Sequence, residues 1–441
     1  MKNRLETQKF LSEKREKRRL KNIAVERMRR KALAKHRDGL LLYLPQTLKI
    51  LQRHIPKGVH PGKEKSETIK IPSTFSIVDN TENALRTIYQ LVAFSSRRRP
   101  PREIYFDHSD LVNFDLAAEE ILDIVALDFQ RIRRWAKGGL QLSGKFPASI
   151  LANRFIRAVG IIKNLELTPF YLRHEEEKSL KILRCLSYRA LLRASEVSPI
   201  ERAAQRLIDY FNECLETSGR QLTEYGRQKL GEYAGEVLDN AIEHSETQDW
   251  VLAGYLDLST PERVCEISIF NFGKSYADTF SELPEDHFTR RVVDPFIEIH
   301  QKKGFFRQGW ERDNLYTVAA LQECISSKNE NQSDNRGSGT VDLIQFFQEV
   351  YGEKRPQDGR RAKMVIISGK TYILFDGRYE MLPDSNDRQI IAFNSENTLE
   401  LPPDQTYVKC LDGVEFPGTI VSIRFPLPRG ATEGVGRRDE R

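Results

Sequence analysis

The sequence predicts an α+β protein with more than one domain. At 441 residues the chain is too long for one ordinary domain. Two series of apolar strand patterns and amphipathic helix patterns follow each other, at 68–162 and 198–427. An apolar content of 39% and a mean hydropathy of −0.53 are typical of a soluble, folded chain.

Residues 1–54 are predicted to form a basic helical arm. Residues 1–38 carry 15 Lys and Arg against 5 Asp and Glu, whereas the rest of the chain carries 54 against 58. The positive charge therefore belongs to one segment, which argues against a broad nucleic-acid surface on the main body. A solvated arm is one interpretation, and a weak nucleic-acid contact through residues 1–38 is the other.

Composition also predicts the compartment. The chain begins with charged residues rather than the apolar segment of a signal peptide, and it contains no apolar run of about 18 residues that could span a membrane. The cysteines are odd in number and widely separated, which favours neither a disulfide framework nor a zinc site: Cys185, Cys214, Cys265, Cys324 and Cys410. We therefore expect a cytoplasmic protein without membrane contact.

A small α/β domain is predicted at 72–175, after a linker at 55–71 that contains several Pro, Gly and Lys residues. Strands are expected at 68–77, 103–106 and 140–143, and helices at 82–94, 116–135 and 149–162. The helix at 116–135 offers a set of apolar residues for the core: Ile121, Ile124, Val125, Leu127 and Phe129.

This small domain resembles a STAS module. Residues 104–117 run from a strand through a polar loop into a helix start, as STAS domains do. Phosphorylatable STAS proteins begin that helix with Asp-Ser or Asp-Thr, whereas here Leu116 follows Asp115. The resemblance thus implies a docking module that has lost its phosphoacceptor. We expect His108 to be a loop residue rather than a ligand.

The rest of the chain is predicted to form a larger domain. Residues 175–194 are charged and look helical, so 176–197 is expected to be a helical connector. Ser198 followed by Pro199 is typical of a helix start. The larger α/β domain is expected at 198–428, and 429–441 is expected to be a flexible tail.

A helix near residue 240 carries the first group of candidate site residues. Glu236, Asp239, Asn240 and Glu243 are spaced so that they share one helical face, while apolar residues occupy the opposite face. A solvated face would look the same, so the pattern alone leaves both interpretations open.

Three further patches follow in order. Residues 264–275 form an apolar run that ends at Asn271, Gly273 and Ser275. Gly337 and Gly339, followed by Thr340, form a loop that leads into a helix, where close backbone approach and the helix N-terminus favour phosphate. A last strand at 416–426 contains Thr419.

Together the four patches resemble the GHKL family of ATP-binding domains, which includes gyrase, a large heat-shock chaperone, histidine kinases and MutL. The resemblance covers about 200–427 and implies a two-layer α/β sandwich of the Bergerat type that binds ATP and Mg²⁺. It implies that Asn240 holds Mg²⁺ and that Glu236 acts on the attacking nucleophile.

The remaining family residues are carried over with two departures. Asn271 stands where the family has an Asp that accepts a hydrogen bond from adenine, and Ser275 stands where the family has a glycine. An amide oxygen accepts the same bond without charge. The other matches are glycine-box or adenine-side positions: Gly273, Gly337, Gly339, Thr340 and Thr419.

The sequence also contains a partial match to another nucleotide-binding pattern. Residues 268–275 nearly match a P-loop, with Ser268 in place of the first glycine, but apolar β-formers occupy the loop. A histidine kinase needs a phosphoacceptor, and His174 lacks the expected context. His244 is expected to pack within its helix.

The function predicted from the resemblance is Mg²⁺-dependent ATP binding. Hydrolysis and closure of a lid at 276–334, which includes a helix at 312–327, would regulate a protein partner. The alternatives are a serine/threonine kinase of the anti-sigma type and a non-catalytic nucleotide sensor or scaffold. The sequence leaves the phosphoryl acceptor, the partner and the oligomeric state open.

Overall fold

The computed structural model describes residues 46–134, 139–160, 178–187, 198–217, 219–244, 250–260, 263–301, 310–331, 339–352 and 362–427. Its architecture is mixed α+β, which confirms the predicted class at that level. None of the described helices combines the length and the apolar character that a membrane crossing needs.

A seven-stranded antiparallel sheet forms the centre of the structure, in the order β13-β10-β9-β14-β8-β7-β6. The long strand β14 lies between β8 and β9, so the end of the chain pairs with strands from two earlier segments. The strands are β6 (Leu180–Leu186), β7 (Trp250–Asp257), β8 (Val264–Phe272), β9 (Lys363–Gly369), β10 (Thr371–Phe375), β13 (Val408–Cys410) and β14 (Phe416–Pro426).

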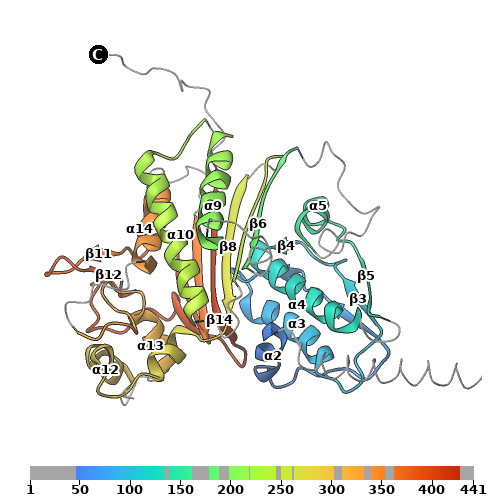
Figure 1. Ribbon diagram of the computed structural model, residues 1–441, viewed down its shortest axis with the longest axis horizontal. Helices are drawn as coiled ribbons and strands as arrows, with labels where there is room; N and C mark the ends of the chain where they lie inside the picture. The colour runs from blue at the N-terminus through green and yellow to red at the C-terminus, as the bar shows by residue number, and fades with distance from the viewer. Residues whose placement is uncertain are drawn as a thin grey trace, which may run out of the picture.

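Three helices cover one face of this sheet (Figure 1): α9 (Pro199–Glu216), α10 (Glu224–His244) and α14 (Gly339–Gly352). Helix α9 begins at the predicted position, because the Ser198 side chain accepts a hydrogen bond from Ile200 N and Glu201 completes the capping box. Leu207, Leu238 and Leu343 from these helices belong to one buried cluster with sheet residues such as Ile267 and Ile269.

Short helices follow β8 near one end of the helical layer: α11 (Tyr276–Ser281), α12 (Phe288–Gln301) and α13 (Arg312–Ala319). The helix predicted at 312–327 therefore ends eight residues early. Residues after Ala319 form turns, in which the side chain of Asn329 donates to the carbonyl of Cys324 at 2.7 Å. A small hairpin of β11 (Leu382–Pro383) and β12 (Gln389–Ile390) lies farther along the chain.

The N-terminal part forms its own module around a parallel sheet of β1 (Ser66–Lys70), β3 (Glu103–Asp107) and β5 (Gln141–Lys145). Its other elements are α2 (Gln46–Arg53), α3 (Thr81–Ser95), α4 (Leu116–Arg134), α5 (Ile150–Val159), β2 (Thr74–Phe75) and β4 (Asn113–Phe114). The predicted strand at 68–77 is divided between β1 and β2, because Pro72 interrupts the pairing.

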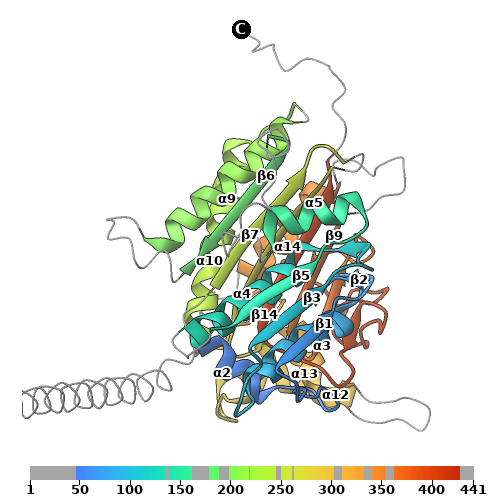
Figure 2. The same ribbon diagram turned by 90° about the vertical axis from the view of Figure 1, so that its right-hand side faces the viewer.

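This N-terminal module packs on the face of the large sheet that the three helices leave open (Figures 1 and 2). Helix α4 contacts β7 and β8. Phe270, Phe272 and Ile367 of the sheet share a buried cluster with the module. The backbone N–H of Leu116, at the start of α4, donates to the Glu266 carboxylate at 2.8 Å. The two predicted α/β units therefore share a core.

Two predicted boundaries are corrected. Residues 180–186 of the expected helical connector (176–197) form the strand β6, because their apolar side chains pack in the sheet while their backbone pairs with β7. Helix α2 lies within the arm predicted at 1–54, yet Leu48 and Leu51 are buried and α2 contacts α3 and α4. Residues 1–45 lie outside the described part of the chain.

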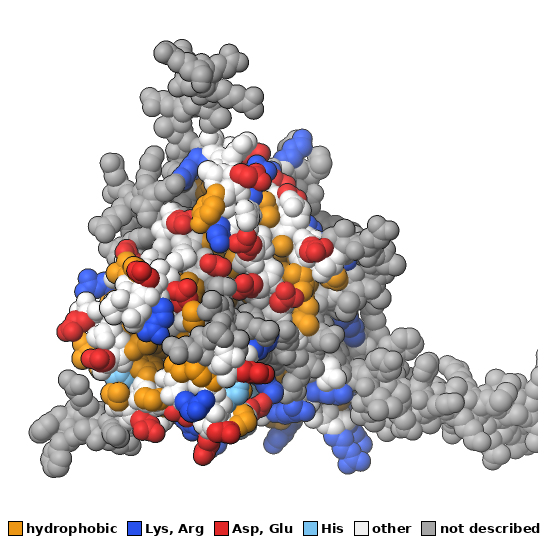
Figure 3. Space-filling model, turned by 60° about the vertical axis from the view of Figure 1, so that its left-hand side comes forward, with side chains coloured by type: hydrophobic (Ala, Val, Ile, Leu, Met, Phe, Trp, Pro, Cys, Tyr) orange, Lys and Arg blue, Asp and Glu red, His pale blue; other side chains and the backbone are white. Residues whose placement is uncertain are grey.

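The surface shown in Figure 3 bears on the charge prediction. Here the described Asp and Glu side chains are interspersed with basic and apolar ones. This face therefore presents no continuous basic surface among the described residues, in keeping with the mildly acidic composition of the main body.

Candidate functional site

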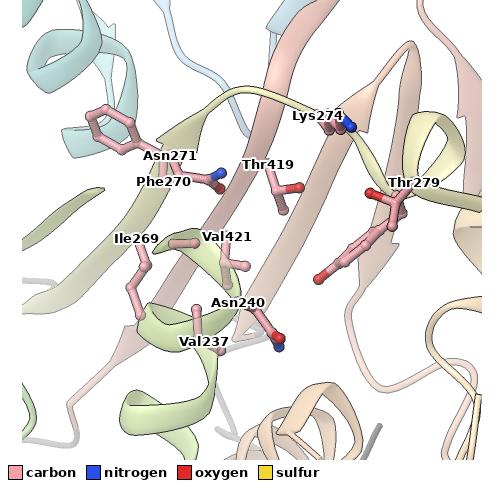
Figure 4. Close-up of a pocket in the computed structure, with 11 residues that line it drawn as sticks. Val237, Asn240, Ile269, Phe270, Asn271, Lys274, Thr279, Thr419 and Val421 are labelled. Atoms are coloured by element: carbon pink, nitrogen blue, oxygen red, sulfur yellow. The ribbon is translucent and has the colours of Figure 1, made fainter. Parts of the chain in front are cut away.

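A cleft open to solvent lies between α10 and the ends of β8 and β14 (Figure 4). About 30 Å³ of its interior is accessible to water centres, and its free space with the open mouth is about 480 Å³. The interior is thus large enough for one water molecule or the edge of a ring, and a larger ligand would extend into the mouth. It is lined by Val237, Asn240, Ala241, Ile269, Phe270, Asn271, Lys274, Tyr276, Thr279, Thr419 and Val421.

Three predicted site residues from different parts of the sequence meet in this cleft: Asn240, Asn271 and Thr419. The pairing of β8 with β14 places Asn271 directly opposite Thr419. The Thr419 hydroxyl lies 3.1 Å from that of Ser368, which also accepts a hydrogen bond from Tyr276 N at 2.8 Å. The Thr419 side chain is therefore held in place by neighbouring elements.

The close approach of the two strands depends on Gly418. Its φ is +124°, and a Cβ atom there would lie 2.1 Å from the backbone oxygen of Asn271. An L-residue is strained at this φ, and a backbone atom cannot rotate away as a flexible side chain could. Gly418 thus fixes the register that brings Asn271 and Thr419 together.

We expect Gly418→Ala to lower the free energy of unfolding by about 2–3 kcal/mol, because it adds a backbone clash to an unfavourable φ. Gly58→Ala is the matched control, since Gly58 has φ +88° but no atom within 4 Å of the added Cβ. Gly58→Ala should lower the free energy of unfolding by only about 1 kcal/mol. Urea unfolding measures both, and equal losses would contradict the proposed clash.

The side chain of Asn271 has an unusual environment. It is only 6% exposed and points into the cleft (Figure 4). Within the described ranges, no protein group forms a hydrogen bond with its amide. Its amide atoms are not among the fully enclosed polar atoms without a partner, so water or a ligand in the open cleft can reach them and supply hydrogen bonds.

Helix α10 brings Asn240 to the cleft, whereas Glu236, one turn earlier on the same helix, does not line it. Ala234, Leu238 and Ala241 are buried against the sheet and fix the rotation of the helix. Asn240 consequently lines the cleft, whereas Asp239 is exposed. The side chain of Glu243 lies outside the described set.

Gly339, from the segment predicted as the second glycine box, lies against Glu236. A Cβ atom on Gly339 would lie 2.1 Å from a carboxylate oxygen of Glu236 and 2.7 Å from its Cβ. Only glycine therefore allows α14 to begin so close to α10. Thr340 forms a hydrogen bond with Tyr276, a side chain of the cleft, and burial raises the pKa of that phenol. Gly337 lies outside the described residues.

The segment predicted as the first glycine box, 271–275, ends in a helix cap. Gly273 N donates to the carbonyl of Pro417 at 3.1 Å. The Ser275 hydroxyl accepts a hydrogen bond from Asp278 N at 3.1 Å, while the Asp278 carboxylate accepts from Ser275 N at 2.9 Å. Ser275 thus begins α11, a role for which serine is better suited than glycine.

The P-loop interpretation is wrong for this structure. Residues 268–272 lie inside β8, which pairs with β7 on one side and with β14 on the other. Their backbone amides are therefore part of the sheet and cannot surround a phosphate. The ammonium of Lys274 forms an ion pair with Glu282.

Among the residues with polar side chains that line the cleft, three were not predicted as site residues: Lys274, Tyr276 and Thr279. Lys274 and Tyr276 follow Gly273 by one and three residues, so proximity to the predicted glycine box is the sequence signal that could have identified them. Thr279 is brought to the cleft by helix α11, and its hydroxyl donates to the carbonyl of Ser275 at 3.0 Å.

The histidines add no further site residues among those described. His108 is a buried loop residue, as expected, and burial lowers its pKa to about 4. His174 and the side chain of His244 lie outside the described set. No group of three or more His, Cys, Asp or Glu suited to a metal ion is found in the described ranges.

Comparisons with models of protein families, with curated proteins and with solved structures found no match to this chain.

Proposed function

We propose that this chain is a Mg²⁺-dependent ATP-binding protein of the GHKL type that hydrolyses ATP. One observation carries the proposal: patches separated by up to about 180 residues in the sequence converge on one cleft. Asn240, Asn271 and Thr419 line it, and Gly339 and Thr340 contact Glu236 and the cleft residue Tyr276. A set of unrelated surface residues has no reason to converge in this way.

The architecture supports the finer fold proposal. An antiparallel sheet with α9, α10 and α14 on one face has the two layers expected of a Bergerat-type domain. The parallel β1-β3-β5 sheet with α3 and α4 supports the STAS-like proposal for the N-terminal module. Both assignments rest on topology together with the motifs in the sequence.

Five of the predicted site residues have proposed roles. Asn240 would bind Mg²⁺ through its amide oxygen, and the ion would neutralise charge on the phosphates. Glu236 would orient a water molecule and accept its proton during attack on the terminal phosphate. Asn271 and Thr419, at the deep end, would contact the edge of the base. The start of α14 at Gly339 would lie near the phosphates.

The N-terminal module of the same chain is one candidate for the phosphoryl acceptor, and the position of Asp115 bears on it. Asp115, at the start of α4, is fully buried and accepts hydrogen bonds from Ser76 Oγ at 2.6 Å and Val78 N at 2.9 Å. It packs near Glu266, on the sheet face opposite the cleft. The N-terminal module is therefore a poor acceptor in the same chain, which favours water over transfer within the molecule.

Asn240→Ala tests the nucleotide site. We expect it to weaken binding of Mg²⁺-ATP by about 10–100-fold, because one metal ligand is lost. Equilibrium titration with a labelled, non-hydrolysable ATP analogue measures the affinity with and without Mg²⁺. Asp239→Ala, an exposed neighbour on the same helix, should bind as the wild type does.

A time course with labelled ATP distinguishes the remaining functions. Release of free phosphate supports the ATPase, and label on a protein supports the serine/threonine kinase. Binding without either product supports the sensor or scaffold. Unchanged nucleotide affinity in Asn240→Ala would contradict the proposed site.

A further inference from the structure

The end of the cleft that we propose to bind the base presents uncharged side chains from β8 and β14, and the ammonium of the lining residue Lys274 is paired with Glu282. Asn271 and Thr419 face each other there on β8 and β14, and both side chains can donate and accept hydrogen bonds. Their apolar neighbours Ile269 and Val421 cannot form side-chain hydrogen bonds. The end of the cleft therefore does not impose a single hydrogen-bond polarity on a ligand.

The orientation of the Asn271 amide is also not fixed by the protein. The side chain is 6% exposed, and no described group forms a hydrogen bond with it. Thr419, in contrast, is held by Ser368 at 3.1 Å. Rotation of the amide by 180° exchanges its oxygen and nitrogen, and here the rotation breaks no hydrogen bond to a described residue.

The two orientations of the Asn271 amide match the two hydrogen-bond patterns that 6-amino and 6-oxo purines present. Adenine offers a donor at its 6-amino group and an acceptor at N1, and hypoxanthine offers an acceptor at O6 and a donor at N1. In one orientation an amide pairs with adenine by two hydrogen bonds, and in the other it pairs with hypoxanthine. An ionised carboxylate can only accept, so it would face O6 with a second electron-rich oxygen.

We propose that Asn271 makes the site tolerant of both purine classes, so that it binds 6-oxo purine nucleotides such as ITP as well as ATP. This inference rests on the proposed nucleotide site and specifies its substrate class. It makes Asn271 the residue that determines base specificity, and it gives a chemical consequence to the replacement of a carboxylate by an amide.

Titration calorimetry of the full chain with Mg²⁺-ATP and Mg²⁺-ITP tests the inference. For the wild type we expect the two dissociation constants to agree within about tenfold, at both pH 6 and pH 8. In Asn271→Asp at pH 8, the preference for ATP should rise by about 10–100-fold. A change in the ratio of the two affinities is a readout that a purely structural role would not produce, since a structural defect weakens the binding of both nucleotides alike.

Asn271→Ala serves as the second variant, because it keeps the site neutral if the aspartate variant folds poorly. Asn271→Ala should weaken the binding of ATP and of ITP by similar factors, since both nucleotides lose the hydrogen bonds of the same amide. A wild-type protein that binds ATP but binds ITP more than 100-fold more weakly overturns the inference and leaves the proposed function intact. Failure of the wild type to bind either nucleotide overturns both.

Discussion

Arg184→Ala should lower the free energy of unfolding by about 3–5 kcal/mol, because it leaves buried carboxylates without their counter-charge. Arg184 lies on β6 and reaches across to α4, where Nε is 2.8 Å from Glu120 and an Nη atom is 2.7 Å from Asp123. Both carboxylates are almost fully buried. The large sheet and the N-terminal module are thus joined by ion pairs that water cannot replace.

The loss should depend on pH. Burial raises the pKa of Glu120 to about 7, although Arg184 lowers it, and burial with repulsion from Asp123 and Glu120 raises the pKa of Glu119 to about 8. In a folded state with raised carboxyl pKa values more protons are bound than in the unfolded state, so stability falls as pH rises from the unfolded pKa near 4.5 through these values. Without Arg184 the pKa of Glu120 rises further, and Arg184→Ala should lose more stability at pH 8 than at pH 5.

Chemical unfolding at both pH values measures the effect. Lys181→Ala is the matched control, because Lys181 lies on the same strand and forms a more exposed pair with Glu213 at 3.3 Å. Lys181→Ala should lower the free energy of unfolding by less than about 1 kcal/mol. Adding Glu120→Gln to Arg184→Ala should recover part of the stability. A loss as small as that of the control would show that Arg184 does not neutralise these carboxylates.

The same residues show why β6 was not predicted from sequence. Lys181 and Arg184 interrupt the apolar pattern, and charged residues precede the strand, so local composition favoured a helix. The strand exists because β7 pairs with it and because α4 neutralises Arg184. The paired carboxylates lie about 60 residues earlier in the chain, a distance over which local patterns carry no information.

Other elements were predictable because the decisive interactions are local. Helix α9 begins at Ser198 through a cap formed within four residues, and the apolar face of α10 follows from helical spacing alone. The strand pairing of Asn271 with Thr419 joins residues 148 positions apart, and no local pattern specifies it. Only the resemblance to a family placed these two residues in one site.

The buried carboxylates of α4 were missed for a related reason. The apolar residues predicted for its core, such as Ile121, Val125 and Phe129, are buried as expected. Glu119, Glu120 and Asp123 are equally buried, although charged residues are mostly exposed in proteins. Because α4 lies between two sheets, no side of its first turns is left to solvent.

Glu236→Gln should reduce ATP turnover by about 10²–10⁴-fold while leaving ATP affinity within about threefold of the wild type. Glutamine has the shape of glutamate, so the close contact with Gly339 persists and the cleft is preserved. It cannot accept a proton from water at neutral pH. The loss should therefore appear in kcat rather than in nucleotide binding.

Phosphate release under saturating ATP measures kcat, and titration with a non-hydrolysable analogue measures affinity. Glu232→Gln is the control, because Glu232 lies one turn earlier on α10, is exposed, and pairs with Lys229 at 3.0 Å away from the cleft. It should leave both quantities unchanged. If Glu236→Gln keeps wild-type turnover, another group must activate the water. A wild type that binds ATP without releasing phosphate would contradict the catalytic role of Glu236 and favour the nucleotide sensor. The packing of Glu236 against Gly339 would then be its remaining role.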